Sequence, residues 1–258
     1  MLSSRTYPYL EHEGPIPFAH RGGAASGLEN SLAAFQRAYD LGYRYVETDV
    51  HATADGVLLA FHDRTLDRVT DRRGAVASLS AIEVARARIG GLEPIPRLVD
   101  LLGSFADLRV NIDVKDAWAI PSLIDVVRRT GAVDRICVAS FSRRRVSAVR
   151  AALGPRLATS YAPRDVAALR LTQALPSLRR LLPRDVPCVQ VPPSVGGVRL
   201  VTDRFLAAAH GVALRVHVWT VNDPGIAGCL LDTGVDGVMT DDLEMLRDAF
   251  QARGLRLG

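Results

Sequence analysis

Lysine and asparagine are nearly missing from this chain. Of its 258 residues 32 are basic, but Lys115 is the single lysine, and asparagine occurs three times. An ammonium is a compact point charge, whereas the guanidinium of arginine is a planar fork, so the two are not interchangeable. A lone lysine in an arginine-rich chain indicates a position that needs an ammonium; the alternative is a chance remainder of the compositional bias.

Cysteine and long apolar runs are also scarce. The three cysteines, Cys137, Cys188 and Cys229, show no CxxC spacing and are odd in number, which argues against a zinc site or a disulfide framework. We expect them to be small buried hydrophobic residues. No run of about 18 apolar residues could span a membrane, and the N-terminus lacks the apolar segment of a secretory signal, so a cytoplasmic location is expected.

Charge argues against one class of partner and favours another. The formal net charge is +4, but no basic run is longer than three residues, from Arg143 to Arg145. Aromatic residues make up 6% of the chain and are not clustered, so the sequence does not indicate a nucleic-acid-binding groove. A weakly positive protein favours small anionic substrates instead.

Short apolar runs alternate regularly with amphipathic stretches. Eight such units in about 250 residues are typical of a TIM (β/α)8 barrel. A doubly wound open sheet is the alternative, but the first turn lacks GxGxxG and the repeat continues to the C-terminus. No linker divides the chain, so residues 1–258 are expected to form one domain. The strands followed by helices are predicted near residues 16–20, 44–50, 109–115, 135–140, 156–161, 187–191, 213–221 and 236–240.

One apolar run, VLLAFHD at residues 57–63, does not fit this repeat. It follows the second strand after only HATADG, which is too short for a parallel crossover but suits an antiparallel return with Asp-Gly at the turn. We therefore predict a short hairpin-like return and an insertion after strand 2. The return carries His62 back toward the mouth of the barrel, and residues 64–109 contain no motif that we can interpret.

Acidic residues lie where the second and third strands end, which is where barrels of this type form their sites. The two-residue period of a strand places Glu47 and Asp49 on the inward face of YVETDV, and Asp113 and Lys115 on the inward face of NIDVK. Three inward carboxylates need either cationic partners, such as Arg21 and Lys115, or a bound cation. Oxygen ligands suit Mg²⁺ or Ca²⁺. The spacing favours a metal site, with a network of salt bridges as the alternative.

Two histidines accompany these acids. His20 ends the first strand in the motif HRG, and His62 lies on the returning segment. Two imidazoles beside a cation are suited to general acid–base catalysis on an ester. The alternative is that each is a packed structural histidine. His51 is expected to line the mouth without a chemical role.

Six separated motifs follow one another along the chain: HRG…EN at 20–30, ETD at 47–49, DG…HD at 55–63, NIDVK at 111–115, WTVN at 219–222 and GVDGVMTD at 234–241. In this order they resemble the glycerophosphodiester phosphodiesterase family, and the similarity covers residues 16–252. The resemblance implies a phosphoric diester hydrolase on a TIM barrel, which converts glycerophosphodiesters to sn-glycerol 3-phosphate and an alcohol with a divalent cation, Mg²⁺ or Ca²⁺.

The resemblance also assigns roles to residues of this chain. The third metal ligand is more usually glutamate in the family, whereas here it is an aspartate, one methylene shorter. A lysophospholipase D or a head-group lyase on the same scaffold is an alternative function, and so is a barrel that only binds phosphorylated ligands. The assigned residues are the acid–base pair His20 and His62, the metal ligands Glu47, Asp49 and Asp113, the phosphate-binding Arg21 and Lys115, and the pocket wall Trp219.

Overall fold

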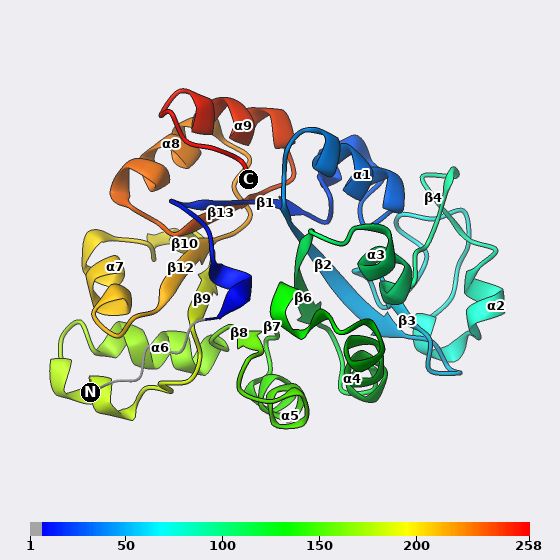
Figure 1. Cartoon of the computed structure of the whole chain (residues 1–258), viewed down its shortest axis with the longest axis horizontal. Helices are drawn as coiled ribbons and strands as arrows, with labels where there is room; N and C mark the ends of the chain where they lie inside the picture. Colours follow the sequence, from blue (N-terminus) through cyan, green and yellow to red (C-terminus); the bar gives the residue numbers. More distant parts are fainter. Residues whose placement is uncertain (1–6) are drawn as a thin grey trace.

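The computed structural model describes residues 7–258 and shows a nearly closed barrel of parallel strands with helices around it (Figure 1). The barrel strands are β1 (Ile16–His20), β2 (Tyr45–Ala52), β6 (Arg109–Val114), β7 (Ile136–Ala139), β8 (Ala158–Thr159), β9 (Cys188–Val191), β12 (Arg215–Val218) and β13 (Gly237–Thr240). They pair in the order β8-β7-β6-β2-β1-β13-β12-β9. An isolated parallel bridge between Ser160 and Cys188 joins the two end strands. The predicted TIM barrel is confirmed.

Helices follow the strands and cover the outside of the barrel. Helix α1 (Leu32–Asp40) is capped by Ser31, whose hydroxyl accepts a hydrogen bond from the backbone N–H of Ala34 at 3.1 Å. Helix α4 (Ala119–Thr130) ends at Gly131, whose φ of 62° lies in the left-handed region that glycine adopts readily. The other helices around the barrel are α3 (Leu98–Ser104), α5 (Arg143–Leu153), α6 (Pro163–Leu171), α7 (Asp203–His210), α8 (Pro224–Thr233) and α9 (Leu243–Gln251).

The predicted return after β2 is confirmed. Strand β3 (Leu58–Ala60) pairs antiparallel with β2, with Val50 opposite Ala60. Gly56 has a φ of 82° in the connecting turn. Just beyond β3 the backbone N–H of Phe61 donates to the carbonyl of Asp49 at 2.8 Å. The return therefore brings His62 beside the carboxyl-terminal part of β2.

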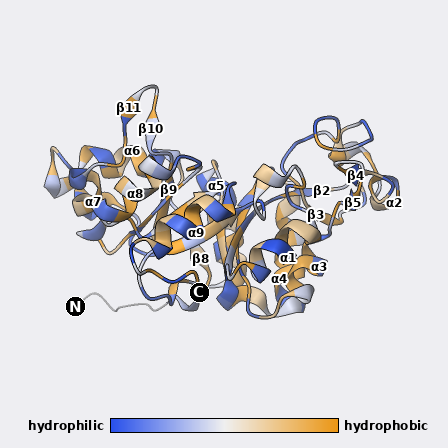
Figure 2. Ribbon diagram, turned by 90° about the horizontal axis from the view of Figure 1, so that it is seen from above, coloured by the Kyte–Doolittle hydropathy of each residue, from blue (hydrophilic) through white to orange (hydrophobic). Residues whose placement is uncertain are grey.

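The segment after β3, which the sequence left without an interpretation, builds a small unit with its own apolar cluster. The cluster includes Leu66, Val76, Val84 and Ile89. Figure 2 shows this unit and the hairpin of β10 (Ser194–Val195) and β11 (Val198–Arg199) projecting on the same side of the molecule. The elements of the unit are η3 (Val76–Ser78), α2 (Ala81–Val84), β4 (Arg88–Ile89) and β5 (Glu93–Pro94), and the short 3-10 helices elsewhere are η1 (Pro8–Leu10), η2 (Ala24–Ser26), η4 (Ala132–Arg135) and η5 (Pro176–Leu181).

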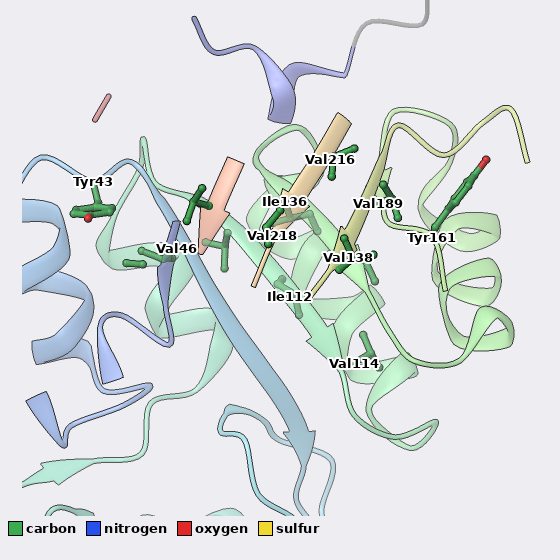
Figure 3. Close-up of a cluster of buried hydrophobic side chains, with 14 of the residues drawn as sticks. Tyr43, Val46, Ile112, Val114, Ile136, Val138, Tyr161, Val189, Val216 and Val218 are labelled. Atoms are coloured by element: carbon green, nitrogen blue, oxygen red, sulfur yellow. The ribbon is translucent and has the colours of Figure 1, made fainter. Parts of the chain in front are cut away.

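Alternation along the strands divides the apolar residues into two layers. Side chains such as Val46 and Ile112 belong to the large cluster between the strands and the helices, part of which is drawn in Figure 3. Side chains such as Phe18 and Tyr45 belong to a separate cluster inside the barrel. The predicted orientation of YVETDV and NIDVK follows, because their apolar residues fill the outer layer and their acids are left to face inward.

The prediction for the cysteines is right for two of them and wrong for the third. Cys137 and Cys188 are buried inside the barrel with their sulfur atoms 3.8 Å apart. Cys229 is exposed on α8, because helix position and not residue type decides which side chains face the barrel. Among residues 7–258 no helix is long and apolar enough to cross a membrane. The cytoplasmic location stays a prediction.

Candidate active site

Strand register places the predicted site residues side by side. His20 on β1 is the register partner of Glu47 on β2, and Asp49 on β2 is the register partner of Asp113 on β6. The three acids are almost fully buried, with 5%, 2% and 9% of their surface exposed. Three adjacent strands therefore bring one imidazole and three carboxylates to the same end of the barrel.

His20 lies between two carboxylates. Its Nδ1 is 2.6 Å from Oδ1 of Asp241, which follows β13, and its Nε2 is 3.6 Å from Oε2 of Glu47. The amide of Asn222 donates to the other oxygen of Asp241 at 2.8 Å and so fixes that carboxylate. Burial alone would lower the pKa of His20, but the nearby charges of Glu47 and Asp241 outweigh burial and raise it. An ionised Asp241 accepts a hydrogen bond from the Nδ1–H group of His20, and this bond orients Nε2 of the same ring toward the buried acids.

His62 is held from two sides. Its Nδ1 is 2.6 Å from Oδ1 of Asp63, and its backbone carbonyl is 3.1 Å from Nε2 of His51. The other nitrogen of His51 lies 2.8 Å from the carboxylate of Asp116. His51 thus anchors the backbone of the return segment, a role that the sequence did not predict. The Nε2 atom of His62 makes no hydrogen bond with any of the described residues.

Arg21 has a backbone conformation that is rare for a residue other than glycine. Its φ is 52°, and such left-handed residues cost on the order of 1–3 kcal/mol and cluster at functional sites. Its Nε lies 3.3 Å from Oδ2 of Asp49, and its Nη1 donates to Oε1 of Glu29 at 3.0 Å. The turn after β1 therefore aims this guanidinium at the buried acids.

Lys115 stands between two of the acids. Its Nζ is 2.7 Å from Oδ1 of Asp49 and 2.7 Å from Oδ2 of Asp113. Across residues 7–258, no group of three or more His, Cys, Asp or Glu side chains is arranged so that it could hold a metal ion. The acids are thus drawn into ion pairs, the alternative to the expected metal site. The lone lysine of the chain occupies a position where a compact charge bridges two carboxylates.

The same cluster is nevertheless short of positive charge. Oδ2 of Asp49 and Oδ1 of Asp113 are buried without a hydrogen-bond donor. Burial raises the pKa of Glu47, and the charge of Asp49 raises it further; burial also raises the pKa of Asp113 in spite of Lys115. Three buried carboxylates, two of which have an oxygen that accepts no hydrogen bond, are a donor set whose chemistry fits a hard divalent cation.

The sequence that builds this site matches the model of a known protein family. The model described as the glycerophosphoryl diester phosphodiesterase family matches residues 20–245. The chain belongs to this family. It is accordingly a phosphoric diester hydrolase.

Relatives of this phosphodiesterase agree in sequence and in fold. A probable glycerophosphodiester phosphodiesterase of Mycobacterium tuberculosis is 41% identical over 253 residues, which cover 96% of each chain. A crystal structure of a putative phosphodiesterase from Silicibacter pomeroyi has a TM-score of 0.80 at 24% identity and covers 98% of this chain and 100% of its own. A phosphodiesterase from Oleispira antarctica, solved with the product sn-glycerol-3-phosphate, has a TM-score of 0.77 at 22% identity and covers 92% and 97%.

Trp219 of the phosphodiesterase follows β12 and packs against the cluster inside the barrel. Its ring lies edge-on to that of Phe141, with 6.1 Å between the centroids. Phe141 follows β7 and is 64% exposed. The two rings give one side of the mouth an apolar surface.

Several residues of this phosphodiesterase site were missed from the sequence. Asp63 directly follows His62, and Asp241 directly follows β13, so their places in the sequence were an available signal. His51 and Asp116 gave none, because their contact depends on how the return segment folds onto β2.

Proposed function

We propose that this enzyme hydrolyses glycerophosphodiesters to sn-glycerol 3-phosphate and an alcohol, with His20 and His62 as an acid–base pair. The observation that supports the proposal is that each imidazole has a carboxylate on Nδ1, Asp241 for His20 and Asp63 for His62. Both Nε2 atoms then stay available for proton transfer beside the cluster of Glu47, Asp49 and Asp113.

The anionic phosphate is expected to bind among the cations of the site. Arg21 can chelate two phosphate oxygens through its planar fork, and Lys115 adds a point charge. Both cations already pair with carboxylates, so they are positioned before the substrate enters. This preorganisation suits a transition state in which negative charge grows on the phosphate oxygens.

Proton transfer then balances the reaction. One imidazole removes a proton from the nucleophile, which is either a water molecule or the glycerol hydroxyl next to the phosphate. The other imidazole gives its proton to the departing alkoxide, so the alcohol leaves neutral. If the glycerol hydroxyl attacks, a cyclic phosphodiester forms, and water opens it in a second step with the roles of the imidazoles exchanged.

We further propose that Glu47, Asp49 and Asp113 hold a divalent cation, Mg²⁺ or Ca²⁺. When bound, such a cation would neutralise charge that develops on a phosphate oxygen. Support for it comes from Oδ2 of Asp49 and Oδ1 of Asp113, which accept no hydrogen bond, and from the chemistry of an all-oxygen donor set. The competing arrangement is the present one, in which Lys115 pairs with both aspartates and Nε of Arg21 lies 3.3 Å from Oδ2 of Asp49.

The deciding experiment measures phosphomonoester release from a panel of glycerophosphodiesters, with EDTA and after adding back Mg²⁺ or Ca²⁺. Turnover that stops with EDTA and returns with one ion supports both proposals. Turnover that EDTA does not change would refute the divalent cation, and Lys115 would then be the charge that neutralises the aspartates in its place. A thermal shift with each ion, measured without substrate, reports binding separately from activity, and no turnover of any diester would refute the substrate assignment.

A lysophospholipase D activity is the second candidate. It is favoured by the exposed apolar side chains near the strand ends, where Phe141 lies beside Trp219 and where Val195 and Val198 are 59% and 58% exposed on the β10–β11 hairpin. A lysolipid would lay its acyl chain on such a surface. Assays of lysophosphatidylcholine beside glycerophosphocholine separate the two functions, and we expect the glycerophosphodiester to have the higher kcat/KM.

A further inference from the structure

The insertion after β3 sends one arginine into the neighbourhood of the site. Arg68 donates from Nη2 and Nη1 to the two carboxylate oxygens of Glu29, at 2.7 and 2.9 Å. It also donates from Nε and Nη2 to the two oxygens of Asp63, at 2.6 and 3.1 Å. A single guanidinium therefore holds two carboxylates in bidentate pairs, which a lysine cannot do.

Each of these carboxylates has a second partner that belongs to the site. Glu29 also accepts a hydrogen bond from Nη1 of Arg21 at 3.0 Å. Asp63 also accepts one from Nδ1 of His62 at 2.6 Å. The result is a continuous row of alternating charge, from Arg21 through Glu29, Arg68 and Asp63 to His62.

The geometry points to Arg68 as a positioning residue that fixes the phosphate-binding Arg21 and the imidazole of His62 relative to one another. The inference rests on the proposed function, because it takes the roles of Arg21 and His62 from it. The hydrogen bonds of Arg68 go to Asp63 and Glu29 and not to His62 or Arg21, so it acts through the two carboxylates.

Burial distinguishes this row from an ordinary surface salt bridge. The side chain of Arg68 is 49% exposed, but those of Glu29 and Asp63 are only 11% and 20% exposed. Burial alone would raise the pKa of each carboxyl, yet the hydrogen bonds and charge of Arg68, together with those of Arg21 at Glu29 and of His62 at Asp63, outweigh burial. They lower both pKa values, that of Asp63 to about 2. Both carboxylates are thus ionised throughout the neutral range and bind their partners as full charges.

The two ends of the row predict different kinetic effects. Glu29→Gln loosens Arg21 and should mainly raise KM, since Arg21 is assigned to phosphate binding. Asp63→Asn loosens His62 and should mainly lower kcat. Arg68→Gln releases both ends, so it should raise KM and lower kcat together, with a loss in kcat/KM of about 10- to 100-fold, the usual effect of removing a group that orients a site residue.

Matched variants keep this inference open to refutation. Arg68→Lys retains the positive charge but not the planar guanidinium. We therefore expect it to recover less than a tenth of the kcat/KM that Arg68→Gln loses. Arg72→Gln removes an exposed arginine of the same insertion whose side chain makes no ion pair with the described residues, and it should keep wild-type kinetics. Asp63→Asn combined with Arg68→Gln should lower kcat no further than the stronger single variant, because both act on His62.

Failure of the inference and failure of the proposed function look different. If the wild-type enzyme turns over no glycerophosphodiester, the proposed function is wrong. If the wild type is active and Arg68→Gln matches Arg72→Gln in both kcat and KM, Arg68 is only a surface residue. A variant that loses thermal stability but has normal kinetics when folded also overturns the inference.

Discussion

The two imidazoles of the site are fixed by carboxylates of different origin. Asp241, which follows β13, lies 221 residues along the chain from His20, whereas Asp63 is the immediate neighbour of His62. In both cases the carboxylate binds Nδ1 and so selects the tautomer with Nε2 toward the site. The proton transfer proposed for each histidine therefore depends on the carboxylate that orients its ring.

At this scale we predict that His20→Ala and His62→Ala each lower kcat by about 10²- to 10⁴-fold, because each removes one partner of general acid–base catalysis. His12→Ala is the control, since His12 precedes β1 and lies outside the site. Steady-state kinetics with circular dichroism as a check on folding measures the effect. Near-normal turnover by both site variants would contradict the assigned roles.

Lys115→Met should destabilise the fold by about 3–5 kcal/mol, since it leaves Asp49 and Asp113 as buried charges without their shared partner. The free energy of unfolding in urea, measured in EDTA, tests this. Arg129→Met is the matched control, because its pair with Asp125 is more than 60% exposed on both sides and is worth only about 0.3–0.5 kcal/mol.

A divalent ion should stabilise Lys115→Met more than the wild type if the acids can hold one. Equal or smaller stabilisation of the variant would count against the proposed metal ligands.

The lowered pKa of Asp63 predicts that the free energy of unfolding depends on pH in the acid range. Its folded pKa of about 2 lies below the unfolded value of about 3.9. The stability it contributes is therefore complete above about pH 4 and is lost as the pH falls through about 2. The difference in unfolding free energy between wild type and Asp63→Asn should shrink from pH 5 to pH 2 in urea titrations. A constant difference over this range would contradict the pairing.

At the scale of elements, two serines at the same helix position differ in what they do. Ser31 caps α1 with its hydroxyl, while Ser142 occupies the N-cap of α5 without a side-chain capping bond. The sequence shows the same residue type before a helix in both places. Only the orientation of the side chain, which depends on packing around it, tells them apart.

Ser31→Ala should lower the free energy of unfolding by about 1 kcal/mol, because the buried N–H of Ala34 loses its acceptor. Ser142→Ala is the matched control and should change it by less than about 0.5 kcal/mol, as substitutions away from such contacts do. Urea denaturation of both variants measures the contrast. Equal losses would show that Ser31 does not act as a cap.

At the scale of the whole molecule, the predictable part of the structure is what depends on local period. Alternation in YVETDV and NIDVK predicted the inward faces that carry Glu47, Asp49 and Asp113, and Asp-Gly predicted the return of β3. Contacts that depend on how the barrel closes were not predictable. Asp241 meets His20 only because β13 pairs with β1, and Arg68 meets Glu29 only because the insertion folds back over the turn after β1.

The number of paired residues between neighbouring strands also differs around the barrel. This difference predicts where the barrel opens first. The pairing of β2 with β6 extends over six residue pairs, whereas β7 pairs with β8 over two. Between β8 and β9 there is only the bridge at Ser160, next to which the N–H of Tyr161 donates to the carbonyl of Cys188 at 3.0 Å. Few ladder hydrogen bonds mean a lower free energy of local opening.

Native-state hydrogen exchange should therefore show the fastest exchange at Ser160 and Tyr161, which directly follow β8, and the slowest in the central residues of β2 and β6. Both regions are buried, so a difference in protection reflects opening and not solvent exposure of the static fold. Uniform protection around the barrel would mean that packing of α5 and α6 holds this seam closed as firmly as hydrogen bonds hold the others. In that case the barrel would open as one cooperative unit.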